Sequence, residues 1–234
     1  MKHDCAQVME LSGQGGSLVN GNGDSVHIEE ELVYPLVKSS MLKHPVIAET
    51  IKYVIVTQKH IGEDTNRLAD MYPKAWAYLQ RHSECFVRRK SIIYRNAPPF
   101  SIFGVGDYSF ATYKVGLSGF YKKPLFALLD PIHGKPTFLD DTLYFLSFSN
   151  RAHAYLAMLL LNEASVQEFL KGICFIDSKR PFTKKVLERI DFRKITEKVS
   201  IEALASTERR LGLPPLCTSE MYQDFQALLP KELF

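Results

Sequence analysis

The sequence predicts an α+β protein in which a twisted, mostly antiparallel β scaffold carries flanking helices and a C-terminal helical tail. Short runs of aromatic and β-branched residues, separated by Gly, Pro and Asp, follow one another between residues 100 and 146, as is typical of short strands joined by turns. Helical patterns replace them after residue 149. A chain of 234 residues is long enough for one domain with appendages or for two small domains.

The β scaffold is expected in the central stretch of the chain. Pairs of turn residues interrupt it, such as Gly104 with Gly106, Gly116 with Gly119, and Asp130 with Pro131. Glycine accepts a positive φ and proline presets a turn, so these positions separate strands. The strands are expected at residues 101–103, 108–110, 113–115, 125–129 and 143–148.

The first thirty residues are expected to form a flexible, acidic linker. Ser12 to Asp24 is rich in Gly, Ser and Asn and offers little apolar surface to bury. Its run SGQGGS resembles a phosphate-binding loop, but no strand precedes it and no Lys-Ser/Thr pair follows, so the linker interpretation is favoured. The predicted division is a tail at residues 1–30, a main domain at residues 31–195 and a helical extension at residues 196–234.

Two further elements are expected before the central stretch. Thr50 to Thr57 has the composition of a strand. Pro73 suits the first turn of a short helix that runs to about Ser83. Trp76 lies three residues before Leu79 on that helix, so a core position is favoured over a base-stacking position.

Helices are expected throughout the last third of the chain. Ser149 or Asn150 can cap a helix to about Leu161 that is apolar nearly all round and therefore buried. Ser165 with Glu168 fits a capping box. Further helices are expected from a cap at Thr183 to Ile190, and in two amphipathic stretches beyond Ile195 that either pack on their own domain or dock on a partner.

Charge is unevenly distributed along the chain. The net charge is only +3. Residues 1–34 nevertheless carry one lysine against six acidic residues, whereas residues 73–123 carry nine basic residues against two acidic ones. A basic middle segment favours a polyanionic partner.

Cysteine spacing and hydropathy exclude several classes of protein. The four cysteines are far apart and form no Cys-x-x-Cys pair, which argues against a zinc site or a disulfide framework and for a reducing compartment. The longest apolar run, Ala152 to Leu161, is too short to cross a bilayer. No apolar core follows the N-terminal Met, so no secretory signal is expected and the predicted location is the cytoplasm.

Catalytic motifs were weighed and set aside. The run Phe103 to Asp107 resembles the Gly-rich cofactor loop of S-adenosylmethionine enzymes, and Asn96 to Phe100 resembles their Asn-Pro-Pro-aromatic clamp. Ala97 interrupts the clamp, and the two motifs lie too close together for a doubly wound sheet. Asp140 and Asp141 lack a third carboxylate at suitable spacing for a metal, so a turn before a strand is favoured.

Several blocks of the sequence resemble a known family. YPLVKSS at residues 34–40, YPKAWAYL at residues 72–79 and FSIFGVGDYSFATYKVGLSGFYK at residues 100–122 are followed by LDDTLYFL at residues 139–146 and two later helical blocks. Together they resemble the TaqI-like C-terminal specificity domain, the target-recognition domain of adenine-N6 DNA methyltransferases and of fused restriction–modification enzymes. The similarity covers roughly residues 31–195.

This resemblance implies a DNA-binding module without its own catalytic domain, which the family enzymes carry N-terminal to it. The implied partners are double-stranded DNA and a methyltransferase or endonuclease catalytic subunit, with no membrane. No cofactor is expected in this chain, and S-adenosylmethionine is expected on the catalytic partner. The helical tail from Thr196 is expected to dock on that partner.

The candidate DNA contacts combine the basic runs with exposed aromatic residues. Arginine forks and aromatic faces suit base edges, and lysines suit phosphates. A solvated basic surface is the competing interpretation of such runs. Base contacts are expected from Arg88, Arg89, Arg95 and Tyr108, and phosphate contacts from Lys114, Lys122, Lys123, Lys179 and Arg180.

Two other functions remain open from sequence alone. One is an enzyme in its own right, such as a nuclease. The other is a scaffold or decoy that binds a methyltransferase and never contacts DNA. Metal-dependent cleavage would favour the first, and partner binding without DNA affinity would favour the second.

Overall fold

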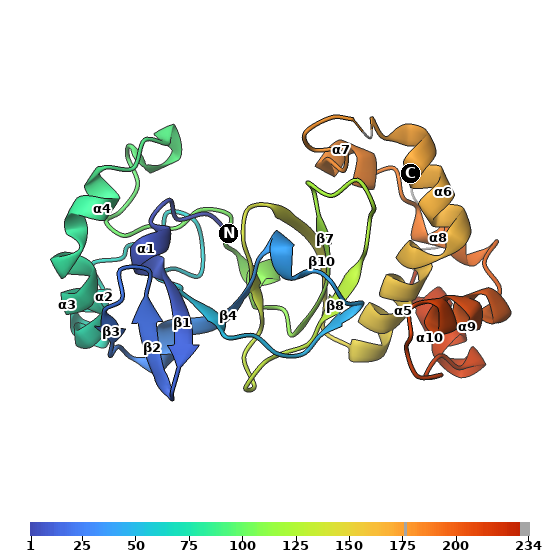
Figure 1. Ribbon diagram of the computed structural model, residues 1–234, viewed down its shortest axis with the longest axis horizontal. Helices are drawn as coiled ribbons and strands as arrows, with labels where there is room; N and C mark the ends of the chain where they lie inside the picture. The colour runs from blue at the N-terminus through green and yellow to red at the C-terminus, as the bar shows by residue number, and fades with distance from the viewer. Residues whose placement is uncertain (176, 230–234) are drawn as a thin grey trace. The chain divides into compact units, whose positions relative to one another are not determined.

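The computed structural model describes residues 1–175 and 177–229. They form an α+β fold whose strands lie in two mixed sheets. Among the described residues, six strand pairings are antiparallel and two are parallel. The chain divides into two compact units, each with its own apolar core (Figure 1).

Unit 1 comprises Met1–Lys38, Ala48–Ala111 and Pro131–Asp141. Its six-stranded sheet has the order β3-β2-β1-β6-β4-β9. The helices α2, α3 and α4 flank the sheet at the β1–β3 end (Figure 1). The elements of unit 1 are α1 Ala6–Met9, β1 Glu10–Gln14, β2 Ser17–Asn20, β3 Ser25–Val26, η1 Glu30–Leu32, β4 Val33–Val37, β6 Lys52–Ile55, α2 Leu68–Met71, α3 Pro73–Arg81, α4 Ser83–Val87, η3 Ile92–Tyr94, η4 Asp107–Phe110 and β9 Phe138–Leu139.

Unit 2 comprises Ser39–Ile47, Thr112–Asp130 and Thr142–Phe234, of which residues 176 and 230–234 lie outside the described part. Its four-stranded sheet has the order β10-β7-β8-β5. Helix α5 packs on this sheet, and α6, α9 and α10 pack on α5. The elements of unit 2 are η2 Ser39–Met41, β5 Val46–Ile47, β7 Tyr113–Ser118, β8 Ala127–Leu129, β10 Leu143–Phe148, α5 Arg151–Asn162, α6 Ala164–Ile173, α7 Lys184–Leu187, α8 Phe192–Thr196, α9 Ile201–Arg210 and α10 Ser219–Leu228.

Helix α5 forms where the sequence predicts it. The Asn150 side chain caps the helix by accepting hydrogen bonds from the amides of Ala152 and His153. Every residue from 154 to 162 is buried, which confirms the prediction of a helix that is enclosed on all sides. Burial of so many apolar side chains is the main stabilising contribution to unit 2.

The N-terminal segment is an ordered part of unit 1, so the expectation of a flexible linker is wrong. Strands β1 and β2 form a hairpin whose two central residues, Gly15 and Gly16, have φ values of 54° and 84°. Two positive φ values in a two-residue loop match the right-handed twist of the paired strands. Strand β1 also pairs with β6, and the Leu11 side chain is fully buried. The glycines therefore make a tight turn.

The acidic residues of this segment have structural partners. Glu10 accepts hydrogen bonds from Lys38 Nζ at 2.8 and 2.9 Å. Glu29 accepts hydrogen bonds from the amides of Lys74 and Ala75, which stabilises the first turn of α3. Slight burial opposes the charge of Glu29, but these amides lower the pKa of its carboxyl group below the ordinary value.

Other expectations fail locally. Residues 108–110 belong to the 3-10 helix η4, and residues 101–103 contribute only an isolated bridge between Lys2 and Phe103. Helix α6 is capped by Glu163, two residues before the expected Ser165. In α9 and α10, Leu204, Tyr222 and Phe225 are buried in the core of unit 2, so these two helices pack on their own unit, which is one of the two expected outcomes; docking of the tail on a partner stays a prediction.

The helix from Pro73 and the role of Trp76 are confirmed. Helix α3 begins at Pro73 and ends at Arg81. The indole of Trp76 packs edge-on against Phe100, with ring centroids 5.3 Å apart. Because Trp76 is the single tryptophan of the chain and lies in unit 1, its fluorescence reports on the unfolding of that unit.

We expect Gly21→Ala to destabilise unit 1. A Cβ at this position would lie 2.8 Å from the backbone Cα of Gln7, and overpacking of this kind costs about 1–3 kcal/mol. Gly13→Ala is the matched control, because its Cβ would meet Tyr53 Cε2 at 3.5 Å and the Ile51 carbonyl oxygen at 3.8 Å, both ordinary contacts. Urea unfolding followed by Trp76 fluorescence measures both variants. Equal stability of the two variants would show that the N-terminal segment is not docked on unit 1.

Candidate nucleic-acid interface

Two loops of unit 2 lie side by side and carry most of its predicted phosphate contacts. The first loop, residues 119–126, joins β7 to β8, and the second, described at residues 174–175 and 177–183, joins α6 to α7. Lys122 Nζ lies 2.9 Å from Asp177 Oδ1, and the Arg180 guanidinium lies 4.6 Å from the centroid of the Phe120 ring. One exposed ion pair and one cation–π contact therefore link the two loops.

Burial beneath the loops fixes their bases. The Phe182 side chain is fully buried in the core of unit 2. Asn162, at the end of α5, is also buried and accepts a hydrogen bond from the Phe126 amide while donating one to the Phe126 carbonyl. These contacts tie both loops to the core, and the basic side chains project from their outer parts.

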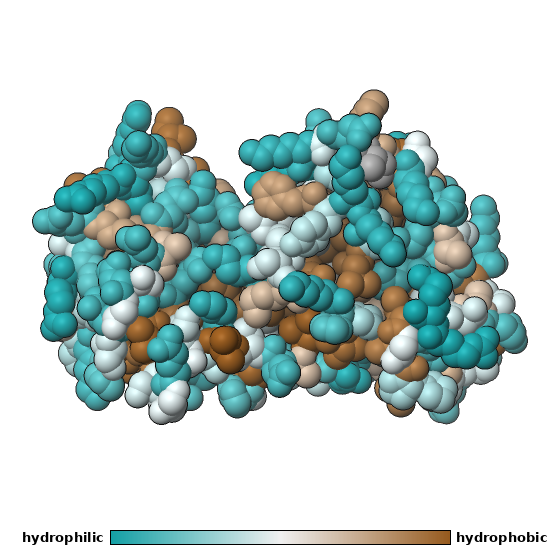
Figure 2. Space-filling view, viewed as in Figure 1, coloured by the Kyte–Doolittle hydropathy of each residue, from teal (hydrophilic) through white to brown (hydrophobic). Residues whose placement is uncertain are grey.

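We call the resulting surface the cationic face. Its basic side chains are all exposed. Hydrophilic side chains cover the surface of unit 2 around α7 (Figure 2). Two acidic residues form ion pairs with lysines of the cationic face: Asp177 with Lys122, and Glu188 with Lys184 at 3.4 Å. The basic residues of the cationic face are Lys122, Lys123, Lys179, Arg180, Lys184 and Lys185.

The cations of this face are available to a ligand at small cost. The Lys122 and Asp177 side chains are 65% and 99% exposed, so their ion pair is screened by water and adds little stability. The Lys122 ammonium lowers the pKa of the Asp177 carboxyl group below its ordinary value. Asp177 therefore stays ionised near neutral pH and is replaceable by another anion, such as a phosphate.

Lys114 does not belong to this surface, and the expected phosphate contact is wrong for it. Its side chain, in β7, is only 1% exposed. The ammonium lies 5.9 Å from the centroid of the Phe145 ring. Burial lowers the pKa of Lys114 to about 8. Residues 114–118 of β7 are all buried, so both faces of this strand are covered, which charge alone does not reveal.

The Arg89 side chain makes several contacts within unit 1. It donates hydrogen bonds to the carbonyl oxygens of Phe86 and Ser101, at 3.2 and 2.6 Å. Its guanidinium also lies 3.8 Å from the centroid of the Tyr94 ring. Burial lowers the pKa of this guanidinium below its ordinary value, with nearby Cys5 and Tyr94 opposing the shift. Its Nε and Nη1 donors are therefore used by backbone carbonyls and are not available to hydrogen-bond a base edge.

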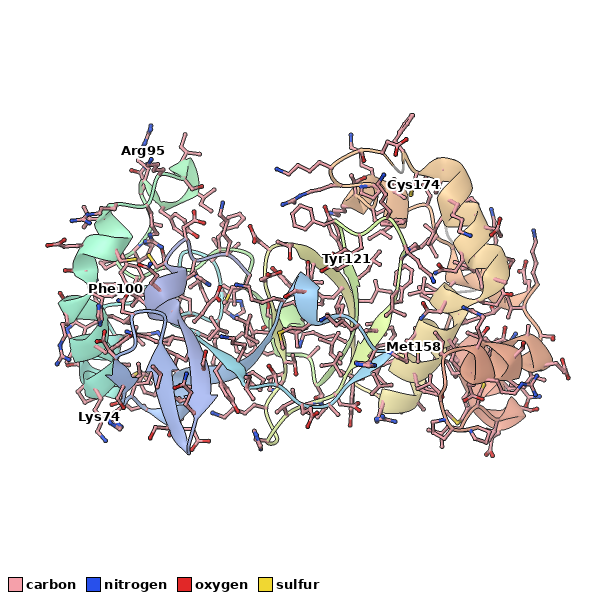
Figure 3. The ribbon with its side chains drawn as sticks, in the orientation of Figure 1. Lys74, Arg95, Phe100, Tyr121, Met158 and Cys174 are labelled. Carbon is pink, nitrogen blue, oxygen red and sulfur yellow. The ribbon has the colours of Figure 1, made fainter. Side chains whose placement is uncertain are left out.

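The other predicted base contacts of unit 1 are exposed. Arg88 pairs with Glu84 one helical turn earlier, at 2.7 Å. Arg95 follows η3 and points away from the body of unit 1 (Figure 3). The Tyr108 side chain is 47% exposed in η4. The structure thus gathers four of the nine predicted residues in the cationic face of unit 2, and it leaves three exposed in unit 1.

Sequence reasoning missed two of the cations in the cationic face. Lys184 and Lys185 belong to the basic run that begins at Lys179, but they were not included among the candidate phosphate contacts. The run itself is visible in the sequence; what it does not show is that the side chains of Lys184 and Lys185 are exposed on the same surface as Lys122 and Lys123.

The motifs set aside from sequence do not form a cofactor or metal site. Gly104, with a φ of 68°, and Gly106 lead into the four-residue η4 rather than into a long helix after a parallel strand. This arrangement differs from the strand–loop–helix crossover that binds cofactors in doubly wound folds. Among the described residues no cluster of three His, Cys, Asp or Glu side chains is placed to hold a metal. None of the helices in the described part of the chain is long and apolar enough to cross a membrane.

Comparison with known proteins gives one informative match. No family model matches the chain. The sequence is, however, related to a type II methyltransferase. The relative is the Type II methyltransferase M.NspV of Nostoc sp. (strain ATCC 29411 / PCC 7524), with 44% identity over 197 residues. The match covers 84% of this chain and 41% of the relative, so the chain spans less than half the length of the curated protein that it matches.

We expect Lys114 to titrate near pH 8 in the folded protein, because burial lowers its pKa to about 8. An exposed lysine titrates near ~10.4. Since the folded-state pKa is the lower one, the free energy of unfolding rises with pH between these two values. NMR titration of isotope-labelled lysines measures the pKa, and Lys114→Met identifies the resonance. A chain in which every lysine titrates near ~10.4 contradicts the buried position.

Proposed function

We propose that this chain is a DNA target-recognition module that lends sequence specificity to a restriction–modification methyltransferase. The similarity to M.NspV carries the proposal, because it extends over 84% of this chain at 44% identity. The resemblance of its sequence blocks to a target-recognition domain of adenine-N6 DNA methyltransferases gives the finer assignment. The cationic face supplies the surface that such a module needs for phosphates.

Phosphate contacts are assigned to the cationic face of unit 2. Lysine and arginine side chains on exposed loops neutralise backbone phosphates and release their counterions, which gives affinity without sequence preference. Exposed Arg88, Arg95 and Tyr108 of unit 1 remain the candidates for base contacts. Arg89 and Lys114 are omitted because the fold uses their side chains.

We assign methyl transfer to the part of such a methyltransferase that this chain does not match. A cofactor-binding methyltransferase domain needs a largely parallel, doubly wound sheet. The described parallel pairings, β4 with β9 and β5 with β8, are each only two residues long. S-adenosylmethionine binding is therefore assigned to a catalytic partner or domain.

Replacing Lys122 and Lys123 together by alanine should flatten the salt dependence of DNA binding. Log affinity falls against log salt by about 0.9 per neutralised phosphate, so the slope should change by up to roughly two units. All DNA sequences should be weakened alike. Fluorescence anisotropy with a mixed-sequence duplex at several salt concentrations measures the slope.

Lys59→Ala with Lys74→Ala is the matched control for this experiment. Both lysines are exposed in unit 1, and their removal changes the net charge by the same amount. The control should keep the slope of the unaltered chain. Equal slopes in the two double variants would place the phosphate contacts elsewhere, and an unaltered chain without affinity at low salt would favour the scaffold function.

Incubation of the chain with labelled S-adenosylmethionine and mixed-sequence duplex DNA should transfer no methyl groups. The reason is that the glycine-containing loop at residues 103–107 does not have the fold of a cofactor loop. Scintillation counting of recovered DNA measures transfer. Saturable turnover that scales with the concentration of the chain would overturn the assignment of catalysis to another part.

A further inference from the structure

A second feature of unit 2 lies next to the cationic face: a pocket of about 650 Å³ behind the first loop. Four basic residues line it, namely Lys43, Lys122, Lys123 and Arg210. None of the described residues that line it is acidic. These cations come from three separate parts of the chain, so sequence reasoning could not bring them together. Their convergence on one hollow makes it a site for an anionic group.

The pocket is held by buried groups. The Arg210 guanidinium donates a hydrogen bond from Nη2 to the carbonyl of Asn162, at the end of α5. Asn162 is itself buried and hydrogen-bonded on both sides of Phe126. Arg210 therefore has one N–H engaged with the fold, and a guanidinium carries five. Its orientation is fixed while donors remain for a ligand.

The pocket is larger and more apolar than a bare phosphate requires. Its volume of about 650 Å³ lies within the range of sites for small organic ligands. Part of the pocket wall is apolar and is formed by Leu117, Leu125 and Leu211. Tyr121, labelled in Figure 3, is 46% exposed and lines the pocket from the first loop. An aromatic ring beside cations is the combination that holds an unstacked base together with its phosphate.

We propose that this pocket binds one unpaired nucleotide of a nucleic-acid strand. Lys122, Lys123 and Arg210 contact the phosphate, and the base lies on Tyr121 and the leucine wall. A paired base inside a duplex cannot enter such a pocket, so the nucleotide is turned out of the helix or belongs to a single strand. This inference rests on the proposed DNA-binding function but assigns a distinct subsite to it.

Saturation-transfer NMR with deoxymononucleotides tests the pocket without knowledge of the DNA site. The probes are dAMP and dTMP, with inorganic phosphate and the two nucleosides as comparisons. Both nucleotides should bind more tightly than phosphate or nucleoside. Tyr121→Ala should weaken nucleotide binding about fivefold or more, because stacking on an aromatic ring contributes about 1–3 kcal/mol per base. Tyr121→Phe should restore it.

Lys185→Gln is the matched control, since Lys185 is exposed in the cationic face and does not line the pocket. It should weaken duplex binding and leave nucleotide binding unchanged. Arg210→Gln should weaken nucleotide binding, with circular dichroism as the check that α9 is intact.

The possible failures are distinguishable. Phosphate binding as tight as nucleotide binding, or nucleotide binding insensitive to Tyr121→Ala, would overturn the nucleotide pocket. Duplex binding by a chain that binds no nucleotide would also overturn it, while the proposed function would stand. Nucleotide binding sensitive to Tyr121 in a chain without duplex affinity would support the pocket and contradict the proposed function.

Discussion

Helix α5 is buried from Ala154 to Asn162, and the rest of unit 2 is built around this buried segment. The sheet β10-β7-β8-β5 and the helices α6, α9 and α10 pack around it. Asn162 at its end is polar and buried, and its side chain holds Phe126, the residue just before β8, through two hydrogen bonds. The first basic loop therefore takes its position from the buried end of α5. Arg210, which lines the nucleotide pocket, is bonded to the same residue.

The sequence predicted the helices whose first turns carry their own capping or proline residue. Asn150 followed by an apolar run predicted α5, and Pro73 predicted the start of α3. The N-terminal segment failed because its order depends on distant partners: β1 pairs with β6 some forty residues away, and Glu29 stabilises the first turn of α3. The Gly15-Gly16 pair was the available signal, since two glycines between strand-like residues are typical of a hairpin.

In the candidate site, too, exposure was predicted correctly where it needed only neighbouring residues, and it was mispredicted where it depended on distant partners. Exposed basic residues in loops, such as Lys122 and Arg180, were found from sequence because loops lie on the surface. Lys114 and Arg89 were misassigned because charge alone does not tell which face of a strand or which carbonyl a side chain meets. Lys43 and Arg210 lie more than a hundred residues apart, and only the fold of unit 2 makes them neighbours in one pocket.

The central claim is that the cationic face of unit 2 contacts the DNA backbone. Lysine acetylation footprinting, with mass spectrometry of the chain alone and with saturating duplex DNA at low salt, tests it residue by residue. The account predicts that DNA protects Lys122, Lys123, Lys179, Lys184 and Lys185 while exposed Lys59 and Lys74 react as before. Equal reactivity of the five lysines with and without bound DNA would contradict it.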